Sequence, residues 1–518
     1  MPTIKINNIQ ITADPSDTIL TAATQAGIYI PTMCWIKVCK PSTSCMVCIV
    51  KDSKSGKILP ACSALVHDGM DIVTIDDEIL DLRKTALELL LSEHQGDCEA
   101  PCQRVCPAEM DIPQMNRLIA EQKFDDAIAI VKQTIALPAV LGYICPAPCE
   151  NACRRKDIDQ AVSICLLKRF VAENDIQKGN TYIPIAKQKN NIKVAIIGSG
   201  PAGLSAAYYL SLQGFSCHIY DSNEQAGGAL RTELKEDVLP AKVLDDEIEI
   251  IKSLQVEFSQ NRTITDVEIR EELSSKYPYI LLTTGIEKHI EISTFEKTNY
   301  SATDEVTIYK VNESLLFASK TMVTKTKMAV CAVAVGRKLS EWISEYIEFQ
   351  HIEKRLKPFN SVYNRISNEE QAEFLKEAKN KSARTSTSQK LQGFTIEQAV
   401  IEAQRCLHCD CRKKQDCVLR DLSTSYKANQ RAYALPVNNT VVKHLEHQNI
   451  IFEDLKCIKC GICIQIAQKE NDEIGFAFQG RGFGMQVSVP LKKSINELSI
   501  NTATNCAKNC PTGALSLK

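Results

Sequence analysis

The sequence has no excess of basic residues, no long apolar run and no secretory signal. The formal net charge is −2 over 518 residues. A nucleic-acid-binding domain usually needs a clear excess of lysine and arginine, so we expect no nucleic-acid partner. No apolar stretch reaches the roughly 18 residues that a membrane-spanning helix needs. Residues 1–12 alternate like a strand and lack the apolar core of a signal peptide. We therefore expect a cytoplasmic protein without a transmembrane segment.

The feature that dominates the sequence is its cysteine content. The chain carries 23 cysteines, and cytosolic thiols stay reduced, so clustered cysteines favour metal or iron–sulfur ligation over disulfides. Cys217 and Cys331 stand apart and are predicted to be buried core thiols. The others form four groups: Cys34, Cys39, Cys45, Cys48 and Cys62; Cys98, Cys102, Cys106, Cys145, Cys149, Cys153 and Cys165; Cys406, Cys409, Cys411 and Cys417; and Cys457, Cys460, Cys463, Cys506 and Cys510.

The first group predicts a two-iron cluster. The spacing Cys34-x10-Cys45-x2-Cys48-x13-Cys62 offers four thiolates to a [2Fe–2S] cluster, and its long gaps are unusual for zinc. Cys39 is predicted to be a spare thiol. The segments IPTMC, SCMVCIV and LPACSALVHDGMDIVT resemble the N-terminal domain of the large iron–sulfur subunit of respiratory complex I and of related hydrogenases. This resemblance implies a β-grasp ferredoxin fold over residues 1–78.

The second group predicts two [4Fe–4S] clusters in a helical domain over residues 79–190. Cys98-x3-Cys102-x3-Cys106-Pro and Cys145-Pro-x2-Cys149-x3-Cys153 flank two amphipathic segments. Two cubane clusters need eight ligands; Cys165 is the seventh thiol, and His94, four residues before Cys98, is the candidate eighth. A helix-end surface role for His94 is the alternative.

The motifs APCQRVCPAEMDIP and ICPAPCENACRR resemble the N-terminal domain shared by the small subunit of glutamate synthase and dihydropyrimidine dehydrogenase. By this resemblance the triplets interleave, with Cys98, Cys102 and Cys153 on one cluster and Cys106, Cys145 and Cys149 on the other. The family's last ligand, Glu or Gln, aligns with Lys168, which as a cation has no lone pair to offer. Cys165 lies on the same helical face and is expected to replace it.

A glycine-rich turn begins the third region, residues 191–345. The strand Ile192–Ile197 leads into Gly198-Ser-Gly200-Pro-Ala-Gly203, a helix, and a second strand Ser216–Tyr220 that ends at Asp221. The glycines let a pyrophosphate approach the helix N-terminus, and Asp221 would bind a ribose hydroxyl. Gly228 and the Thr284-Gly285 turn resemble further dinucleotide contacts of the glutamate synthase small subunit, so the pattern predicts an FAD site.

The same region also shows losses. About 25 residues after Gly285 contain no second glycine-rich turn for NADPH, and FASKT (Phe317–Thr321) stands where the family has a Gly-Asp pair for the flavin. We therefore expect a truncated Rossmann-type domain whose flavin site is damaged at one end. A retained fold that binds nothing is the alternative.

Two more cysteine groups lie beyond a helical linker at residues 346–405. In residues 406–445, Cys406-x2-Cys409-x-Cys411-x5-Cys417 predicts one centre, either [4Fe–4S] or zinc. In residues 446–518, Cys457-x2-Cys460-x2-Cys463 begins a ferredoxin cubane motif, with Cys510 favoured over Cys506 as fourth ligand because it precedes proline. DLKCIKCGICIQIA and NCPTGAL again resemble complex I and iron hydrogenase subunits.

The sequence thus predicts a multidomain chain of α/β and α+β parts. One [2Fe–2S] and three or four [4Fe–4S] clusters would surround an eroded flavoprotein core. Such a row of centres serves electron hopping. The favoured interpretation is an oxidoreductase subunit that passes electrons to or from hydrogenase, formate dehydrogenase or NAD(P)H dehydrogenase subunits. A self-sufficient NAD(P)H-dependent flavoenzyme and a structural scaffold are the alternatives.

Overall fold

The computed structural model divides the chain into two compact units. It describes residues 1–284, 290–301, 303–319, 328–354, 356–363, 366–387, 391–433 and 444–518. The first unit comprises Met1–Ala100, Leu356–Lys376 and Cys409–Lys518, and the second comprises Pro101–Arg355 and Glu377–His408. The unit boundaries fall between Cys98 and Cys102 and between Cys406 and Cys409. Thiols that are close in sequence therefore belong to different units.

The N-terminal part of the first unit is a mixed sheet with a helix on one face. Its strands follow the order β2-β1-β5-β3-β4, and β1 runs parallel to β5. The elements are β1 (Thr3–Ile6), β2 (Ile9–Thr12), α1 (Ile19–Gln25), β3 (Ile49–Asp52), β4 (Ile58–Pro60) and β5 (Asp71–Val73). The alternation of residues 3–6 buries Ile4 and Ile6 in one core with Ile19, as a period of two requires.

A long helix connects this sheet to the C-terminal part of the same unit. Helix α2 (Asp77–Glu93) begins at Asp76, whose carboxylate accepts the N–H of Ile79, and ends at His94. The buried Arg83 on α2 donates to the carbonyl of Ile49 at 2.8 Å and to the hydroxyl of Tyr426 at 3.1 Å. Arg83 therefore joins the N-terminal sheet to the segment that follows α18 (Val418–Ser425).

The C-terminal part of the first unit contains a small antiparallel sheet and short helices. Strand β14 pairs with both β13 and β17, and β15 and β16 form a separate hairpin. The elements are α16 (Asn368–Glu377), β13 (His444–Glu446), β14 (Ile450–Glu453), α19 (Ile462–Lys469), β15 (Ala477–Gln479), β16 (Gln486–Ser488), α20 (Ile500–Asn509) and β17 (Leu515–Leu517). One apolar core contains Phe452 and Leu515 of this sheet together with Met33 and Val47 of the N-terminal region.

Seven helices form the first part of the second unit. They are α3 (Pro101–Arg104), α4 (Ile112–Ala120), α5 (Phe124–Lys132), α6 (Pro138–Ile144), α7 (Pro148–Asn151), α8 (Ile164–Gln177) and α17 (Ile396–Ala403). Helix α8 packs against α5 and α6, and α17 packs against α4 and α8. The approach of α6 to α8 needs a glycine, because a Cβ on Gly142 would lie 2.5 Å from the Cβ of Arg169.

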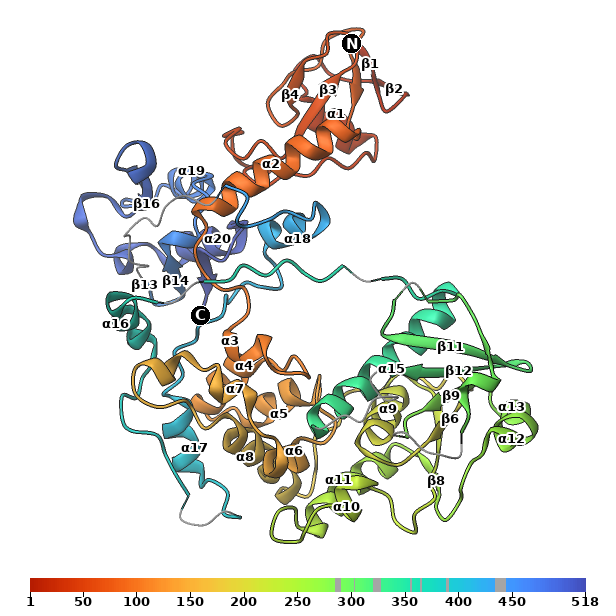
Figure 1. Cartoon of the computed structure of the whole chain (residues 1–518). Coiled ribbons are helices and arrows are strands. Elements are labelled where there is room, and N and C mark those ends of the chain that lie inside the picture. The colour runs from red at the N-terminus through yellow and green to blue at the C-terminus, as the bar shows by residue number, and fades with distance from the viewer. Residues whose placement is uncertain are drawn as a thin grey trace. The chain divides into compact units, whose positions relative to one another are not determined.

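The second part of this unit is a mainly parallel sheet of seven strands with the order β10-β11-β12-β9-β6-β7-β8 (Figure 1). The strands are β6 (Lys193–Ile197), β7 (Ser216–Tyr220), β8 (Glu257–Ser259), β9 (Tyr279–Leu282), β10 (Glu296–Lys297), β11 (Val306–Val311) and β12 (Ser314–Ser319). The helices are α9 (Pro201–Leu212), α10 (Ala229–Thr232), α11 (Ala241–Ser253), α12 (Asp266–Glu268), α13 (Ser274–Lys276) and α15 (Ala329–Phe349).

The helical part and the sheet of the second unit are joined by a buried carboxylate. Glu247 on α11 accepts the backbone N–H groups of Ala139 and Val140, at the start of α6, at 2.7 and 2.9 Å. Helix α15 packs along α9, where a Cβ on Gly336 would lie 2.2 Å from the carbonyl oxygen of Ala202.

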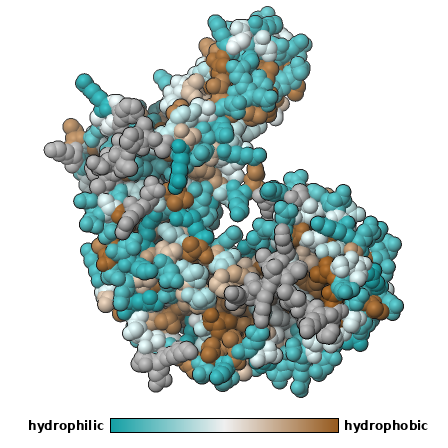
Figure 2. Space-filling view, viewed as in Figure 1, coloured by the Kyte–Doolittle hydropathy of each residue, from teal (hydrophilic) through white to brown (hydrophobic). Residues whose placement is uncertain are grey.

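The surface visible in Figure 2 is mostly hydrophilic, with hydrophobic residues scattered over it. Among the described residues, no helix combines the length and the apolar character needed to cross a bilayer.

Candidate iron–sulfur and nucleotide sites

The N-terminal sheet brings four of the predicted thiols together. Cys34 and Cys45 share a hydrogen bond that lowers the pKa of Cys34 and raises that of Cys45. Cys48 and Cys62 share a hydrogen bond that lowers the pKa of Cys48 and raises that of Cys62. The charges of Cys34 and Cys45 raise the pKa of Cys62 further. All four are at most 3% exposed. Four buried thiols at one place are the donor set that a two-iron cluster takes.

Cys39 lies apart from this quartet. It is partly exposed, and burial raises the pKa of its thiol while the charge of Lys469 lowers it. It packs against the C-terminal apolar core. That Cys39 is a spare thiol stays a prediction.

In the C-terminal part, four thiols line one cavity. Cys457, Cys460, Cys463 and Cys510 share it with the apolar side chains of Phe452 and Val487. Burial raises the pKa of Cys457 to about 12, and the charge of Cys510 acts in the same direction. Cys506 is outside this lining, fully buried, and donates its thiol to the carbonyl of Cys463 at 3.5 Å. Cys510 therefore lines the cavity together with the three thiols of the motif, and its role as the fourth ligand stays a prediction.

The thiol sets of the first unit follow one another closely. Burial is the largest cause of the raised pKa of Cys460, and the charges of Cys510, Cys457 and Cys34 raise it further. Because Cys34 belongs to the N-terminal quartet, this quartet lies within electrostatic range of the C-terminal cavity. Burial is the largest cause of the raised pKa of Cys417. The negative charges of Cys411, Cys98 and Cys510 raise this pKa further, so these thiols are within electrostatic range of Cys417. The C-terminal cavity is therefore close to thiols on both sides.

The second unit assembles another quartet around Lys168. Cys145 and Cys165 share a hydrogen bond that raises the pKa of Cys145, and Cys149 raises the pKa of Cys165. The charges of Cys165, Cys145, Cys149 and Cys106 all raise the pKa of Lys168, against the effect of its burial. Lys168 is 4% exposed. The thiols expected to hold the second helical cluster therefore surround one buried ammonium group.

The remaining predicted ligands occupy two neighbourhoods, one in each unit. Cys98 lies close to Cys411 in the first unit, and Cys153 lies close to Cys406 in the second. His94 is buried next to Lys456, and its Nδ1 atom has no hydrogen-bond partner in the described part of the chain. The ligand roles predicted for Cys102 and Cys409 stay predictions.

Zinc at the third cysteine group also stays a prediction. Across the residues that the structure describes, no three His, Cys, Asp or Glu side chains converge as the ligands of a single metal ion would.

The glycine-rich turn has the geometry of a phosphate-binding loop. A Cβ on Gly203 would lie 1.9 Å from the carbonyl oxygen of Gly198, and one on Gly228 would lie 2.9 Å from the Cα of Gly200. Gly198 has a φ of +104°, and Gly200 precedes α9 with no side-chain cap. The turn therefore brings backbone N–H groups to a helix start without side chains in the way, as an approaching pyrophosphate requires.

Asp221 makes contacts that the sequence did not indicate. One carboxylate oxygen accepts the backbone N–H and the hydroxyl of Ser199 at 2.6 and 2.7 Å, and the other accepts the backbone and side-chain N–H groups of Asn223, both at 2.8 Å. A carboxylate offers about four acceptor positions. All are used within the protein, so a ribose hydroxyl would have to displace one of these donors.

The far side of the nucleotide site is only partly described. Thr284 follows β9, and its side chain is 2.9 Å from where a Cβ of Gly198 would lie. Gly285 lies outside the described residues, as do Lys320 and Thr321 of the FASKT segment. Their predicted roles therefore stay predictions.

The sequence pattern predicts no role for the positive charge of Lys168. Its position three residues after Cys165, on the same helical face, is the signal that points to one. In the described residues no carboxylate forms an ion pair with it, and its charge acts on the four thiols as well as on the carboxylate of Glu247. A cation beside a cluster stabilises the more negative, reduced state and raises the potential.

Replacing Lys168 by methionine should lower the midpoint potential of that cluster by about 100 mV. A unit charge a few ångströms away contributes about 2–4 kcal/mol at an effective dielectric constant near 20. EPR-monitored redox titration of the anaerobic protein would measure the shift. Lys132→Met is a matched control, because Lys132 is equally buried but is paired with Asp175 at 2.7 Å. An unchanged potential in Lys168→Met would contradict the electrostatic role.

Three family models match separate stretches of the chain. A 2Fe-2S iron–sulfur cluster binding domain matches residues 1–77, domain II of dihydropyrimidine dehydrogenase with its 4Fe-4S cluster matches residues 94–180, and an NAD(P)-binding Rossmann-like domain matches residues 196–255. The chain is thus multidomain, with iron–sulfur regions followed by a Rossmann-like region. These matches confirm the coarse part of the prediction. They do not distinguish FAD from another dinucleotide.

Several curated relatives match a little more than a third of the chain. The beta subunit of NADPH-Fe(3+) oxidoreductase from Geobacter sulfurreducens is 37% identical over 188 residues, 36% of this chain and 28% of the relative. The beta subunit of NADP(+)-dependent formate dehydrogenase from Moorella thermoacetica is 35% identical over 210 residues, 36% of this chain and 29% of the relative. The PreT subunit of NAD-dependent dihydropyrimidine dehydrogenase from Escherichia coli is 34% identical over 204 residues, 39% of this chain and 49% of the relative.

The matched stretches span between about a quarter and a half of these three relatives. Among solved structures, an NAD+-reducing [NiFe]-hydrogenase in its H2-reduced state is 31% identical over 18% of this chain and 39% of its own, with a TM-score of 0.17.

Proposed function

We propose that the chain is an iron–sulfur electron-transfer subunit of a multisubunit oxidoreductase. The observation that carries the proposal is the close succession of thiol sets within the first unit. The charge of Cys34, in the N-terminal quartet, contributes to the raised pKa of Cys460 in the C-terminal cavity, where burial is the largest cause. The charge of Cys510, in that cavity, contributes in the same way to the raised pKa of Cys417. Clusters held at these sets would be near neighbours, and electron transfer then needs no further chemistry from the protein.

Within the second unit, a cluster would lie near the nucleotide fold. After burial, the charges of Cys145 and Cys106 raise the pKa of Cys331 on α15. Helix α15 packs along α9, whose first turn follows the glycine loop, and the hydroxyl of Ser205 on α9 donates to the carbonyl of Val333 at 2.7 Å. A cluster held around Lys168 would therefore lie next to the helix pair that supports the dinucleotide.

The finer assignments belong to the same proposal. They are a β-grasp ferredoxin at residues 1–78, a double-cluster helical domain at 79–190, a truncated glutamate synthase-like FAD domain at 191–345, a linker at 346–405, a four-cysteine segment at 406–445 and a ferredoxin-like domain at 446–518. FAD would supply a two-electron to one-electron exchange when bound. The open glycine loop supports a bound dinucleotide, whereas the occupied carboxylate of Asp221 makes its ribose contact weaker than the motif implies.

The partners would be dehydrogenase or hydrogenase subunits. Relatives named as beta subunits of NADP(+)-dependent formate dehydrogenase and NADPH-Fe(3+) oxidoreductase support this class of partner.

The test is the iron content of the anaerobically purified chain. One two-iron and four four-iron clusters amount to about 18 iron atoms per chain. Iron and zinc analysis, flavin extraction and EPR of the dithionite-reduced protein would measure this. About 14 iron atoms with one zinc would assign zinc to one four-cysteine site. Fewer than about 10 iron atoms with no EPR signals of reduced clusters would refute the relay.

A further inference from the structure

We propose that Arg384 sets the reduction potential of the cluster held around Lys168, by neutralising the carboxylate of Glu150. Arg384 belongs to a short stretch of the second unit, residues 380–385, which is called the 380–385 segment below. Arg384 acts through Glu150 and not on the cluster directly, so it is a positioning residue. The inference rests on the proposed function, because it requires a [4Fe–4S] cluster at the thiols of the second unit.

The carboxylate of Glu150 lies among the thiols of the second unit. Glu150 follows Cys149 on α7, and its Oε1 atom accepts the backbone N–H of Cys165 at 2.9 Å. The negative charge of Glu150 also contributes to the raised pKa of Cys153, where burial is the largest cause. A negative charge at this place lowers the potential of a nearby cluster, because reduction adds a further negative charge.

The guanidinium of Arg384 forms an ion pair with this carboxylate. Its Nη2 atom lies 2.5 Å from the Oε2 atom of Glu150, and its Nε–H donates to the hydroxyl of Ser163, the residue before α8, at 2.8 Å. The side chain of Arg384 is 33% exposed and that of Glu150 is 15% exposed. The pair is therefore partly shielded from water, and a change in its charge reaches the thiols more strongly than a change at a fully solvated position.

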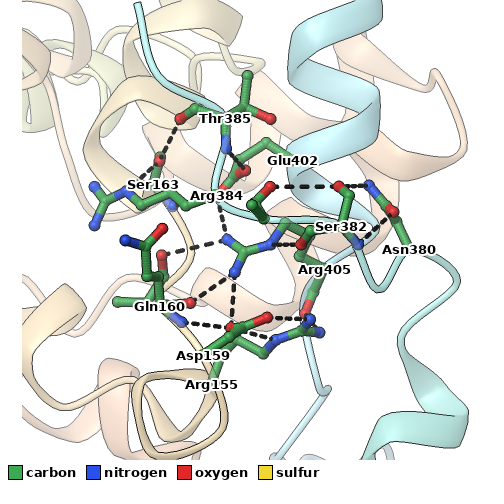
Figure 3. A network of polar contacts seen from close by, with 12 residues as sticks. Arg155, Asp159, Gln160, Ser163, Asn380, Ser382, Arg384, Thr385, Glu402 and Arg405 are labelled. Atoms are coloured by element: carbon green, nitrogen blue, oxygen red, sulfur yellow. Dashed lines mark hydrogen bonds and ion pairs between the residues drawn. The ribbon is translucent and has the colours of Figure 1, made fainter.

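Hydrogen bonds attach the C-terminal end of the 380–385 segment to the loop that precedes α8 (Figure 3). The carboxylate of Glu402, on α17, accepts the N–H groups of Ser163 and Thr385 at 2.8 and 2.7 Å. The hydroxyl of Ser163 donates to the carbonyl of Thr385 at 3.3 Å. Both backbone polar groups of Thr385 are thus bound, and this attachment places the preceding residue, Arg384, beside Ser163.

Arg405 holds the middle of the 380–385 segment. Its guanidinium is fully buried and donates to the carbonyl of Ser382 at 3.0 Å and to the carboxylates of Glu402 and Asp159, both at 2.9 Å. Arg155 donates to the same Asp159 at 2.6 Å. Breaking one partner of such a buried charged network is costly. The network of Figure 3 therefore keeps this segment in place.

Glu150 and Lys168 place opposite charges near Cys165. The buried ammonium group of Lys168 raises the potential of a cluster at this place, and an uncompensated carboxylate at Glu150 would offset part of that effect. The ion pair with Arg384 cancels the charge of the carboxylate, so the charge of Lys168 dominates. Freeing Glu150 from Arg384 therefore has the same sign as removing Lys168: the potential falls.

The test measures midpoint potentials by EPR-monitored redox titration of the full anaerobic chain. Arg384→Gln should lower the potential of the cluster that Cys165→Ser alters, by less than Lys168→Met does, because solvent screens the partly exposed pair. Glu150→Gln should raise it, since the amide keeps an oxygen for the N–H of Cys165 but leaves Arg384 uncompensated. In the double variant the two shifts should cancel. Arg384→Lys keeps the charge and should stay close to the wild type.

Lys381→Gln is the matched control, because it removes the same charge from the 380–385 segment at an exposed position, and it should leave the potential unchanged. Equal shifts in Lys381→Gln and Arg384→Gln would overturn the inference, and so would a double variant that keeps the low potential of Arg384→Gln. If Arg384→Gln lost iron, a raised potential in Glu150→Gln would support the inference and an unchanged one would overturn it. Wild-type protein without [4Fe–4S] signals would refute the proposed function instead.

Discussion

Replacing Cys165 by serine should remove one [4Fe–4S] cluster of the second unit, or convert it to a three-iron form. The structure places Cys165 with Cys145 and Cys149, and the three thiols surround Lys168 together with Cys106. Lys168 stays protonated there, so it has no lone pair with which to replace the lost thiolate. We expect a loss of one to four iron atoms per chain, and for the three-iron product the EPR signal of an oxidised [3Fe–4S] cluster.

Cys331→Ser is the matched control for this variant. Cys331 lies within electrostatic range of Cys145 and Cys106 but on α15, outside the quartet. Its replacement should leave the iron content unchanged. If Cys165→Ser kept the wild-type iron content and spectra while Cys331→Ser lost iron, Cys331 would be the ligand and the assignment of Cys165 would be wrong.

The isolated chain should not reduce its clusters with NADH or NADPH at a useful rate. Hydride transfer requires the reacting carbon of the nicotinamide and the flavin nitrogen to lie about 3–3.5 Å apart. This needs one phosphate-binding turn for the flavin and another for the nicotinamide nucleotide. The sequence contains a single G-x-G-x-x-G turn, at Gly198, and β9 is followed by the β10–β12 strands where the second turn would stand.

The measurement is an anaerobic titration followed by visible absorption. NADH and NADPH would be added separately, and dithionite would serve as the positive control for reducible clusters. We expect bleaching with dithionite only, and bleaching by a nucleotide only after a partner subunit is added. Rapid bleaching by either nucleotide without a partner would establish a nicotinamide site in this chain and favour the self-sufficient flavoenzyme.

The local signals in the sequence predicted the secondary structure well where spacing and periodicity were strong. The strand Ser216–Tyr220 has the predicted bounds, and β6 begins at Lys193, one residue after the predicted start. Cys457, Cys460 and Cys463 are close in sequence and line one cavity, because a short loop can direct three side chains to the same place.

Closeness in sequence does not describe the contacts of the third cysteine group. Its thiols find their neighbours at Cys153 and Cys98, more than 250 residues earlier in the chain. The side chains that place them, Arg405 with Asp159 and Arg420 with Glu99, are also distant in sequence. Spacing carries no information about such pairs, since any two segments can be joined once the chain folds back.

By itself, the sequence determined that this protein carries iron–sulfur cluster domains, since the number of thiols and the tight C-x2-C spacing are local and compositional properties. It also determined the glycine turn, because backbone approach to a phosphate depends on which residues lack a Cβ. Only the tertiary structure showed that the carboxylate of Asp221 accepts hydrogen bonds from Ser199 and Asn223. It also placed the positive charge of Lys168 among four thiols, and it assigned Cys406 and Cys411 to different units. Each of these depends on burial and on long-range contacts, which set the strength of a charge and the partners of a donor.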